Sequence, residues 1–228
     1  MKRLQLDLMI GMISVAAKFD DLEEQPIGAL PPRDRILRTA SDLFYRFSIH
    51  TVGIDRIIAE SGVAKMTFYK HFPSKANLIA IYLRQKRDIW FDMLLAAANA
   101  PGLPPAERVL AVFDALGTSF GSPSFRGCPF VKGMTEFGPD ADAPEIQTII
   151  SSYFESLQNL VAALIEPMRL ADPEKALVQI LSLIQGSIVM AQATSNPAIA
   201  AANRDAARLL LQVDCAAAPR PEERTEAE

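Results

Sequence analysis

A run of polar side chains between residues 65 and 75 carries the most distinctive chemistry in this sequence of 228 residues. Ammonium groups and hydroxyls bind phosphate oxygens, and amines, hydroxyls and aromatic groups contact base edges and the thymine methyl group. Side chains of these kinds, together with the apolar Met66, crowd one short stretch at Lys65, Met66, Thr67, Tyr69, Lys70 and His71. The residue types therefore predict a surface that binds nucleic acid, if a helix turns them outward.

The first element that must position this stretch is a helix beginning near Arg33. Pro32 suits the start of a helix, because the N–H that it lacks would have no partner there. Apolar residues then recur three to four positions apart, which predicts one buried helix face. They are Ile36, Ala40, Leu43, Phe44 and Phe47.

Three more helices follow in quick succession. A short one contains Ile54 and is predicted to end at Gly62, which tolerates positive φ. The next runs over residues 65–72 with Phe68 turned inward, and Ser74 caps a longer fourth helix. Two short helices joined by a tight glycine-containing turn form the helix-turn-helix geometry, whose second helix lies in the DNA major groove. The N-terminal amides of the second and fourth helices are also suited to holding phosphates.

Charge along the chain agrees with this interpretation. The formal net charge of −4 argues against a nucleic-acid partner when it is taken as an average over the chain. However, residues 33–87 contain 11 Lys or Arg and 4 Asp or Glu, a net charge of +7, together with both histidines. The remaining 12 basic and 23 acidic residues give −11. The sequence therefore predicts a small basic unit followed by a larger acidic, apolar unit.

The stretch Thr51–Lys75 resembles the DNA-binding domain of TetR-family transcriptional regulators. The similarity covers roughly residues 33–83 and is most specific over residues 67–75. It implies an all-α homodimer that binds a palindromic operator in double-stranded DNA, as a repressor released by a small-molecule effector. By position, the resemblance also implies a set of DNA contacts. In it Thr67, Tyr69 and His71 touch DNA, Lys65 and Met66 approach base edges, Lys70 lies beside the backbone, and Lys75 and Thr51 hold phosphates.

Three residues depart from the family pattern. Ser48 stands where a glycine often closes the first helix, so this end must adopt positive φ with a side chain or use another geometry. Ala64 replaces a Ser or Thr and removes a capping hydroxyl worth about 1 kcal/mol. Met66 is often a glycine, so base preference is expected to differ. His50 is equally compatible with a solvated loop position and with a place beside a phosphate.

The rest of the chain has helical periodicity throughout. The predicted fold is all-α, with an N-terminal three-helix helix-turn-helix DNA-binding domain and a larger helical ligand-binding and dimerisation domain. These domains are expected over residues 33–80 and 81–214, between a flexible N-terminal arm at 1–32 and a disordered tail at 215–228.

A ligand pocket is predicted in the second domain. Residues 126–137 are similar to a Gly-Cys-Pro-Phe segment followed by Glu-Phe, found in one large subset of TetR-like regulators. The predicted lining is apolar and consists of Phe113, Leu116, Phe120, Phe130, Met134, Phe137 and Tyr153. Ordinary core packing explains Met and Phe at this spacing equally well. Glu136 is the polar exception, and three roles stay open for it: orienting a ligand, pairing with Arg126, or facing water.

A dimer interface is predicted on the last two helices, which the family resemblance pairs across a two-fold axis. Its residues form two apolar stripes, at Leu177, Ile180, Leu181, Ile184, Ile188, Ala206, Leu209 and Leu210. The alternative is that both stripes pack inside one chain.

Other classes of function find little support. The acidic unit contains no histidine, and the sequence has no glycine-rich phosphate loop, so no catalytic site, metal or cofactor is predicted. A carboxylate pair assembled in space remains an alternative, and so does a helical interaction protein, although the latter leaves residues 67–75 unexplained. Two cysteines form no disulfide framework, and polar residues interrupt the apolar stretches, so a cytoplasmic protein without membrane spans is predicted.

Overall fold

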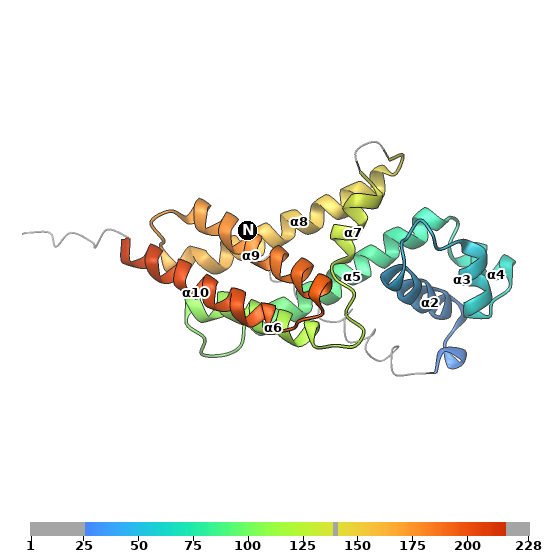
Figure 1. The fold of residues 1–228 in the computed structure, drawn as a ribbon. Coiled ribbons are helices and arrows are strands. Elements are labelled where there is room, and N and C mark those ends of the chain that lie inside the picture. Colours follow the sequence, from blue (N-terminus) through green and yellow to red (C-terminus); the bar gives the residue numbers. More distant parts are fainter. Residues whose placement is uncertain (1–25, 139–140, 218–228) are drawn as a thin grey trace, which may run out of the picture. The chain divides into compact units, whose positions relative to one another are not determined.

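The computed structural model describes residues 26–138 and 141–217, and every regular element in these ranges is a helix (Figure 1). The predicted arm up to residue 25 and the tail from residue 218 lie outside the described residues, whereas residues 215–217 belong to the last helix. The chain divides into two compact units. Unit 1 comprises residues up to Met93 together with Arg126–Glu155, and unit 2 comprises Leu94–Phe125 and the chain from Ser156 onward. The division differs from the expected one, because residues 126–155 pack with the N-terminal helices.

Unit 1 holds the predicted helix-turn-helix. Its elements are η1 (Ile27–Ala29), α2 (Pro32–Arg46), α3 (Ile54–Ser61), α4 (Lys65–His71), the first part of α5 (Lys75–Ala98), α7 (Pro129–Glu136) and the first part of α8 (Pro144–Ile165). The apolar face predicted for α2 is buried, and the ring of Phe44 packs edge-on against Tyr82 of α5 with centroids 5.4 Å apart. Phe68 is fully buried, as predicted, and so is Phe72.

The end of α2 corrects one prediction. Phe47 does not continue the apolar face, because the backbone is already extended there and the side chain is 40% exposed. Its ring instead lies under the guanidinium of Arg56, 4.5 Å from the ring centroid, and beside that of Arg46. Ser48 does not need positive φ: among described residues other than glycine, only Arg169 and Ser195 have it. The helix therefore uses the second of the two expected geometries.

The turn between α3 and α4 has the conformation that the sequence predicts. Gly62 ends α3 in the left-handed conformation, with φ 65°, and Val63 is buried behind it. Ala64 precedes α4 without a side-chain cap, as its lack of a hydroxyl dictates. At the start of α5 the Ser74 hydroxyl accepts a hydrogen bond from the Asn77 amide at 3.0 Å.

The left-handed Gly62 gives a direct test of this turn. Replacing Gly62 by alanine is expected to destabilise the protein by about 1–2 kcal/mol, because a Cβ strains the left-handed conformation even though nothing lies within 4 Å of it. Thermal unfolding followed by circular dichroism measures the effect. The matched control is Gly28→Ala, where a Cβ also meets open space but φ is not positive. Equal melting temperatures for the two variants would contradict the assignment of strain to Gly62.

An aromatic cluster forms the second half of the unit 1 core. Tyr153 of α8 is fully buried and stacks on Phe130 of α7, with ring centroids 3.8 Å apart and planes 4° from parallel. Phe91 of α5 approaches the same tyrosine at 5.7 Å. The thiol of Cys128 lies 3.9 Å from the Tyr153 hydroxyl. Burial raises the pKa of the Cys128 thiol. Cys128 is thus a buried, inert thiol of the core.

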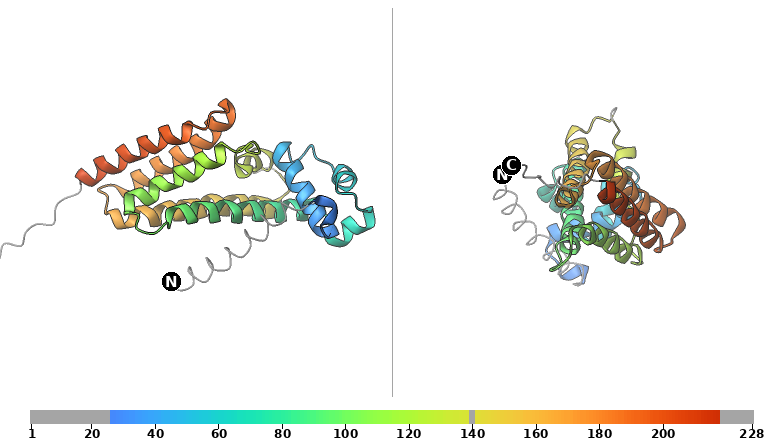
Figure 2. Two further views of the ribbon diagram at one scale, coloured as in Figure 1. Left: turned by 90° about the horizontal axis from the view of Figure 1, so that it is seen from below. Right: turned by 90° about the vertical axis from the view of Figure 1, so that its left-hand side faces the viewer.

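Unit 2 is a packed group of helices formed by α6 (Pro105–Phe120), the last parts of α5 and α8, η2 (Glu166–Met168), α9 (Pro173–Thr194) and α10 (Ile199–Ala217). Figure 2 shows α6, α9 and α10 side by side, and each contacts the other two. A Cβ on Gly117 of α6 would meet that of Ala200 on α10 at 3.3 Å, so the small residue permits this close approach. Arg204 of α10 pairs with Glu107 and Asp114 of α6 at 3.0 and 2.9 Å.

Helix α9 departs from two expectations. It is long and apolar enough to meet a length-and-composition test for a membrane span, which the sequence was not expected to contain. Core helices pass the same test, and α9 packs against α6 and α10. The stripe formed by Ile180, Ile184 and Ile188 is fully buried inside the single chain. These three residues, predicted to face a second copy, instead belong to the core of unit 2.

Candidate nucleic-acid interface

The outward face of α4 gathers the residues that the sequence singled out for DNA contact. Met66 is 85% exposed and Tyr69 is 43% exposed. Large apolar side chains are more often buried than these two are. Together with Thr67 and Lys70 they line a shallow hollow on the surface. Lys65 is exposed, and its Nζ lies 3.8 Å from Oδ1 of Asp55 in α3. An ion pair between two solvated side chains is weak at this separation. His71 is half-buried at the end of the helix.

The inner face of α4 explains why this display is fixed. Phe68 and Phe72, one helical turn apart, are fully buried and lie 6.0 Å from each other. The Tyr69 ring packs edge-on against Phe68 at 5.3 Å, so the phenol is held while its outer side stays exposed. The guanidinium of Arg33 covers the ring of Phe72 at 5.7 Å. A buried aromatic pair thus sets which way the outward residues point.

Two predicted phosphate-binding residues stand at the starts of neighbouring helices. Thr51 is exposed before α3, and its hydroxyl donates to the Ser48 carbonyl at 3.0 Å. Lys75 is the first residue of α5, and its Nζ donates to the His50 carbonyl at 3.3 Å. Partial burial lowers the pKa of Lys75, and the Glu136 carboxylate opposes that shift. The hydrogen bond therefore draws the Lys75 ammonium towards the loop that carries Thr51.

Glu136 ends α7 and binds the loop between α2 and α3. Its Oε2 accepts hydrogen bonds from the Ser48 hydroxyl and the His50 amide, both at 2.8 Å, and its Oε1 accepts one from the Ile49 amide at 3.2 Å. The His50 Nε2 lies 2.9 Å from the Glu136 carbonyl oxygen, and its ring packs on Phe137 at 4.8 Å. His50 is therefore engaged with α7, and Glu136 caps a loop of the same unit, a role outside the three left open.

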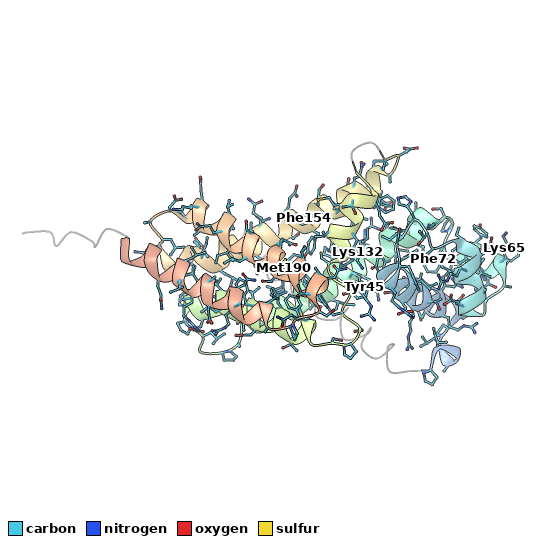
Figure 3. All side chains as sticks on the ribbon, viewed as in Figure 1. Tyr45, Lys65, Phe72, Lys132, Phe154 and Met190 are labelled. Carbon is cyan, nitrogen blue, oxygen red and sulfur yellow. The ribbon has the colours of Figure 1, made fainter. Side chains whose placement is uncertain are left out.

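A second set of contacts joins α2 to the segment around α7. The Tyr45 hydroxyl donates to the Gly127 carbonyl at 2.9 Å and accepts from the Arg126 amide at 3.1 Å. Figure 3 shows Lys132 close to Tyr45, and its Nζ donates to the Tyr45 carbonyl at 3.1 Å. Burial raises the pKa of Tyr45 and lowers that of Lys132. Residues 126–137 are thus fastened to the helix-turn-helix at two places.

The residues predicted to line a ligand pocket fall in both units. Phe113, Leu116 and Phe120 are buried in unit 2, and Phe130, Phe137 and Tyr153 are buried in unit 1. Met134 is 51% exposed on α7. The stacking of Phe130 on Tyr153 accounts for the burial of both rings without a ligand. The pocket itself stays a prediction.

Apolar residues do remain exposed on the helices predicted to form a dimer. Leu209 of α10 is 63% exposed, and Val178, Val189 and Met190 of α9 also lie on the surface. Leu177, Leu181, Ala206 and Leu210 are half-buried. The helices predicted to form a dimer therefore carry exposed apolar residues, which lie beside the isoleucine stripe rather than on it. The dimer itself stays a prediction.

The hydrogen bonds between Glu136 and residues 48–50 were not predicted from the sequence. Two signals were present: a lone acidic residue in an apolar segment, and a serine where a glycine was expected. Neither could identify the other as its partner across a sequence separation of 88 residues.

Comparisons with known proteins agree with this geometry. Residues 36–80 match the family described as bacterial regulatory proteins, tetR family. The HTH-type transcriptional regulator YxaF of Bacillus subtilis is 24% identical over 161 residues, which span 69% of this chain and 83% of that protein. The HTH-type transcriptional regulator RutR of Escherichia coli is 39% identical over 61 residues, covering 27% of this chain and 29% of RutR.

The fold is also similar to solved structures. A TetR-family transcriptional regulator from Streptomyces coelicolor superimposes with a TM-score of 0.74 at 29% sequence identity. The superposition covers 81% of this chain and 90% of the other. The likeness therefore extends well beyond the helix-turn-helix.

Proposed function

Because the chain belongs to the TetR family of DNA-binding transcriptional regulators, we propose that it represses genes from a palindromic operator until a small ligand releases it. Its relatives regulate transcription and are not enzymes. The observation that carries the proposal is the outward face of α4, where Lys65, Met66, Thr67, Tyr69 and Lys70 are displayed over a buried aromatic pair. In this proposal α4 enters the major groove, and Thr51 and Lys75 hold phosphates on either side.

A homodimer supplies the two-fold symmetry that a palindromic operator requires. The support is the exposed apolar surface of α9 and α10, because unpartnered Val178, Met190 and Leu209 favour burial against a second copy. The two α4 helices would then meet successive turns of one face of the duplex, about 34–36 Å apart.

Release by a ligand follows from a difference in affinity between two states. An effector that binds more tightly to a dimer with another spacing of the α4 helices shifts the population away from the DNA-bound form. The support is that six of the seven apolar residues predicted to line the pocket are buried, Met134 being the exception. The proposed place of action is the cytoplasm, where the operator is accessible.

The experiment that tests the operator proposal is footprinting on DNA flanking the gene, followed by binding measurements on the protected segment. The expected result is one protected palindrome with half-sites one helical turn apart, bound by two chains. Saturation by a single chain, or protection without two-fold symmetry, would overturn the proposal.

Charged substitutions on the exposed helix faces are expected to separate the dimer. In Met190→Glu/Leu209→Glu, two carboxylates enter a surface that must lose water on association, which costs several kcal/mol in total. Sedimentation velocity at micromolar concentration is expected to show dimeric wild type and a monomeric variant. The control is Met134→Glu, which places a charge at an exposed methionine of unit 1. A monomeric wild type would rule out the dimer.

A further inference from the structure

Within the proposed DNA-binding function, on which this inference rests, we propose that Glu136 is a positioning residue for DNA contact. It touches no DNA. Its carboxylate fixes the loop of residues 48–50, and the loop fixes the phosphate-binding groups at the starts of α3 and α5.

The Glu136 carboxylate accepts three hydrogen bonds from the loop of residues 48–50. Both Glu136 oxygens accept from the loop, through the Ser48 hydroxyl and the Ile49 and His50 amides. Bonds to an ionised acceptor are about twice as strong as neutral ones. Without them the two amides would need other partners. The loop conformation therefore depends on a residue 86 to 88 positions away in sequence.

The loop of residues 48–50 is hydrogen-bonded to both predicted phosphate-binding side chains, Lys75 and Thr51. The Lys75 ammonium donates to the carbonyl of His50, the residue whose amide Glu136 holds. The Thr51 hydroxyl donates to the carbonyl of Ser48, whose own hydroxyl Glu136 holds. Both predicted phosphate-binding side chains are thus one hydrogen bond from the clamped loop. A shift of α7 that moves Glu136 would move both.

The charge of Glu136 and its positioning role predict opposite changes in DNA affinity when the carboxylate is neutralised. A carboxylate beside a phosphate-binding surface repels DNA, so simple electrostatics expects its neutralisation to strengthen binding. A positioning role expects the opposite. Gln has the size of Glu but only one acceptor oxygen, and its amide group would face donors in the loop. The direction of the change in affinity therefore distinguishes the two roles.

The test is a DNA-binding titration of full-length wild type, Glu136→Gln and Glu145→Gln. Fluorescence anisotropy reports binding, and the titration is repeated over a range of salt concentrations. Glu145 lies in the same unit and pairs with Arg84, so its replacement removes the same charge without touching the loop. Glu136→Gln is expected to bind about tenfold more weakly, the effect of one hydrogen bond to a charged group. Its salt dependence is expected to lose about one phosphate contact, a slope change near 0.9. Glu145→Gln is expected to bind as tightly as wild type or more tightly.

Ser48→Ala keeps the proposal falsifiable if Glu136→Gln folds poorly. It removes one of the three donors and leaves the carboxylate charged, so a smaller loss of affinity is expected. When Ser48→Ala is added to Glu136→Gln, no further loss of affinity is expected beyond that of Glu136→Gln alone, because both changes act through one interaction. Glu136→Gln or Ser48→Ala binding as tightly as Glu145→Gln would overturn the positioning role. Wild type that binds no DNA would instead overturn the proposed function.

Discussion

Replacing Tyr153 by alanine is expected to lower the free energy of unfolding by roughly 3–5 kcal/mol, the usual effect of removing a large buried ring. Tyr153 is fully buried, stacks on Phe130 and approaches Phe91, so its loss leaves a cavity where α5, α7 and α8 meet. Total stabilities are only about 5–15 kcal/mol, so the change is large. Chemical denaturation followed by circular dichroism measures it.

The matched control is Tyr153→Phe, which keeps the stacked ring and removes the hydroxyl that contacts Cys128. This variant is expected to lose less than about 1.5 kcal/mol. Because α7 also carries Glu136, unfolding of the Tyr153→Ala protein is expected to release the loop at residues 48–50 as well. An alanine variant within 1 kcal/mol of wild type, a margin of about fivefold in the folding equilibrium, would contradict the account of this core.

Replacing both Lys65 and Lys70 by glutamine is expected to weaken binding to all DNA sequences, by roughly tenfold to a hundredfold at moderate salt. Each lysine is exposed on the outward face of α4 and contributes by releasing counterions from the duplex. The slope of log affinity against log salt is expected to fall by about 1 for each lysine. Anisotropy titrations at four or more salt concentrations give this slope.

The control for this double variant is Arg169→Gln/Lys175→Gln. Both residues are exposed in unit 2, and the change in net charge is the same. Its salt dependence is expected to match that of wild type. Equal slopes for the α4 variant and wild type would remove α4 from the DNA interface.

Much of unit 1 was predictable because local rules decide it. Apolar spacing, the left-handed glycine at 62 and the cap at Ser74 each act within a few residues, and the structure confirms all three. Phe47 was misplaced for a local reason too. The helical phase predicts a buried position only while the helix lasts, and α2 ends one residue earlier.

The rest depends on contacts that no local pattern specifies. A stripe such as Ile180, Ile184 and Ile188 shows that one helix face is buried, but it does not show whether the cover comes from the same chain or from another. Here the cover comes from the same chain. Likewise, the packing of residues 126–155 with the helix-turn-helix, and the bond from Glu136 to Ser48, join segments far apart in sequence.

The most direct test of the central claim, that α4 contacts an operator, is a salt-dependent titration of wild type with the DNA flanking its gene and with a shuffled sequence. The account predicts tight binding to the flanking DNA, a preference of about 10³-fold or more over the shuffled duplex, and a steep loss of affinity with salt. Binding that is undetectable, insensitive to salt or equal for the two sequences would contradict it.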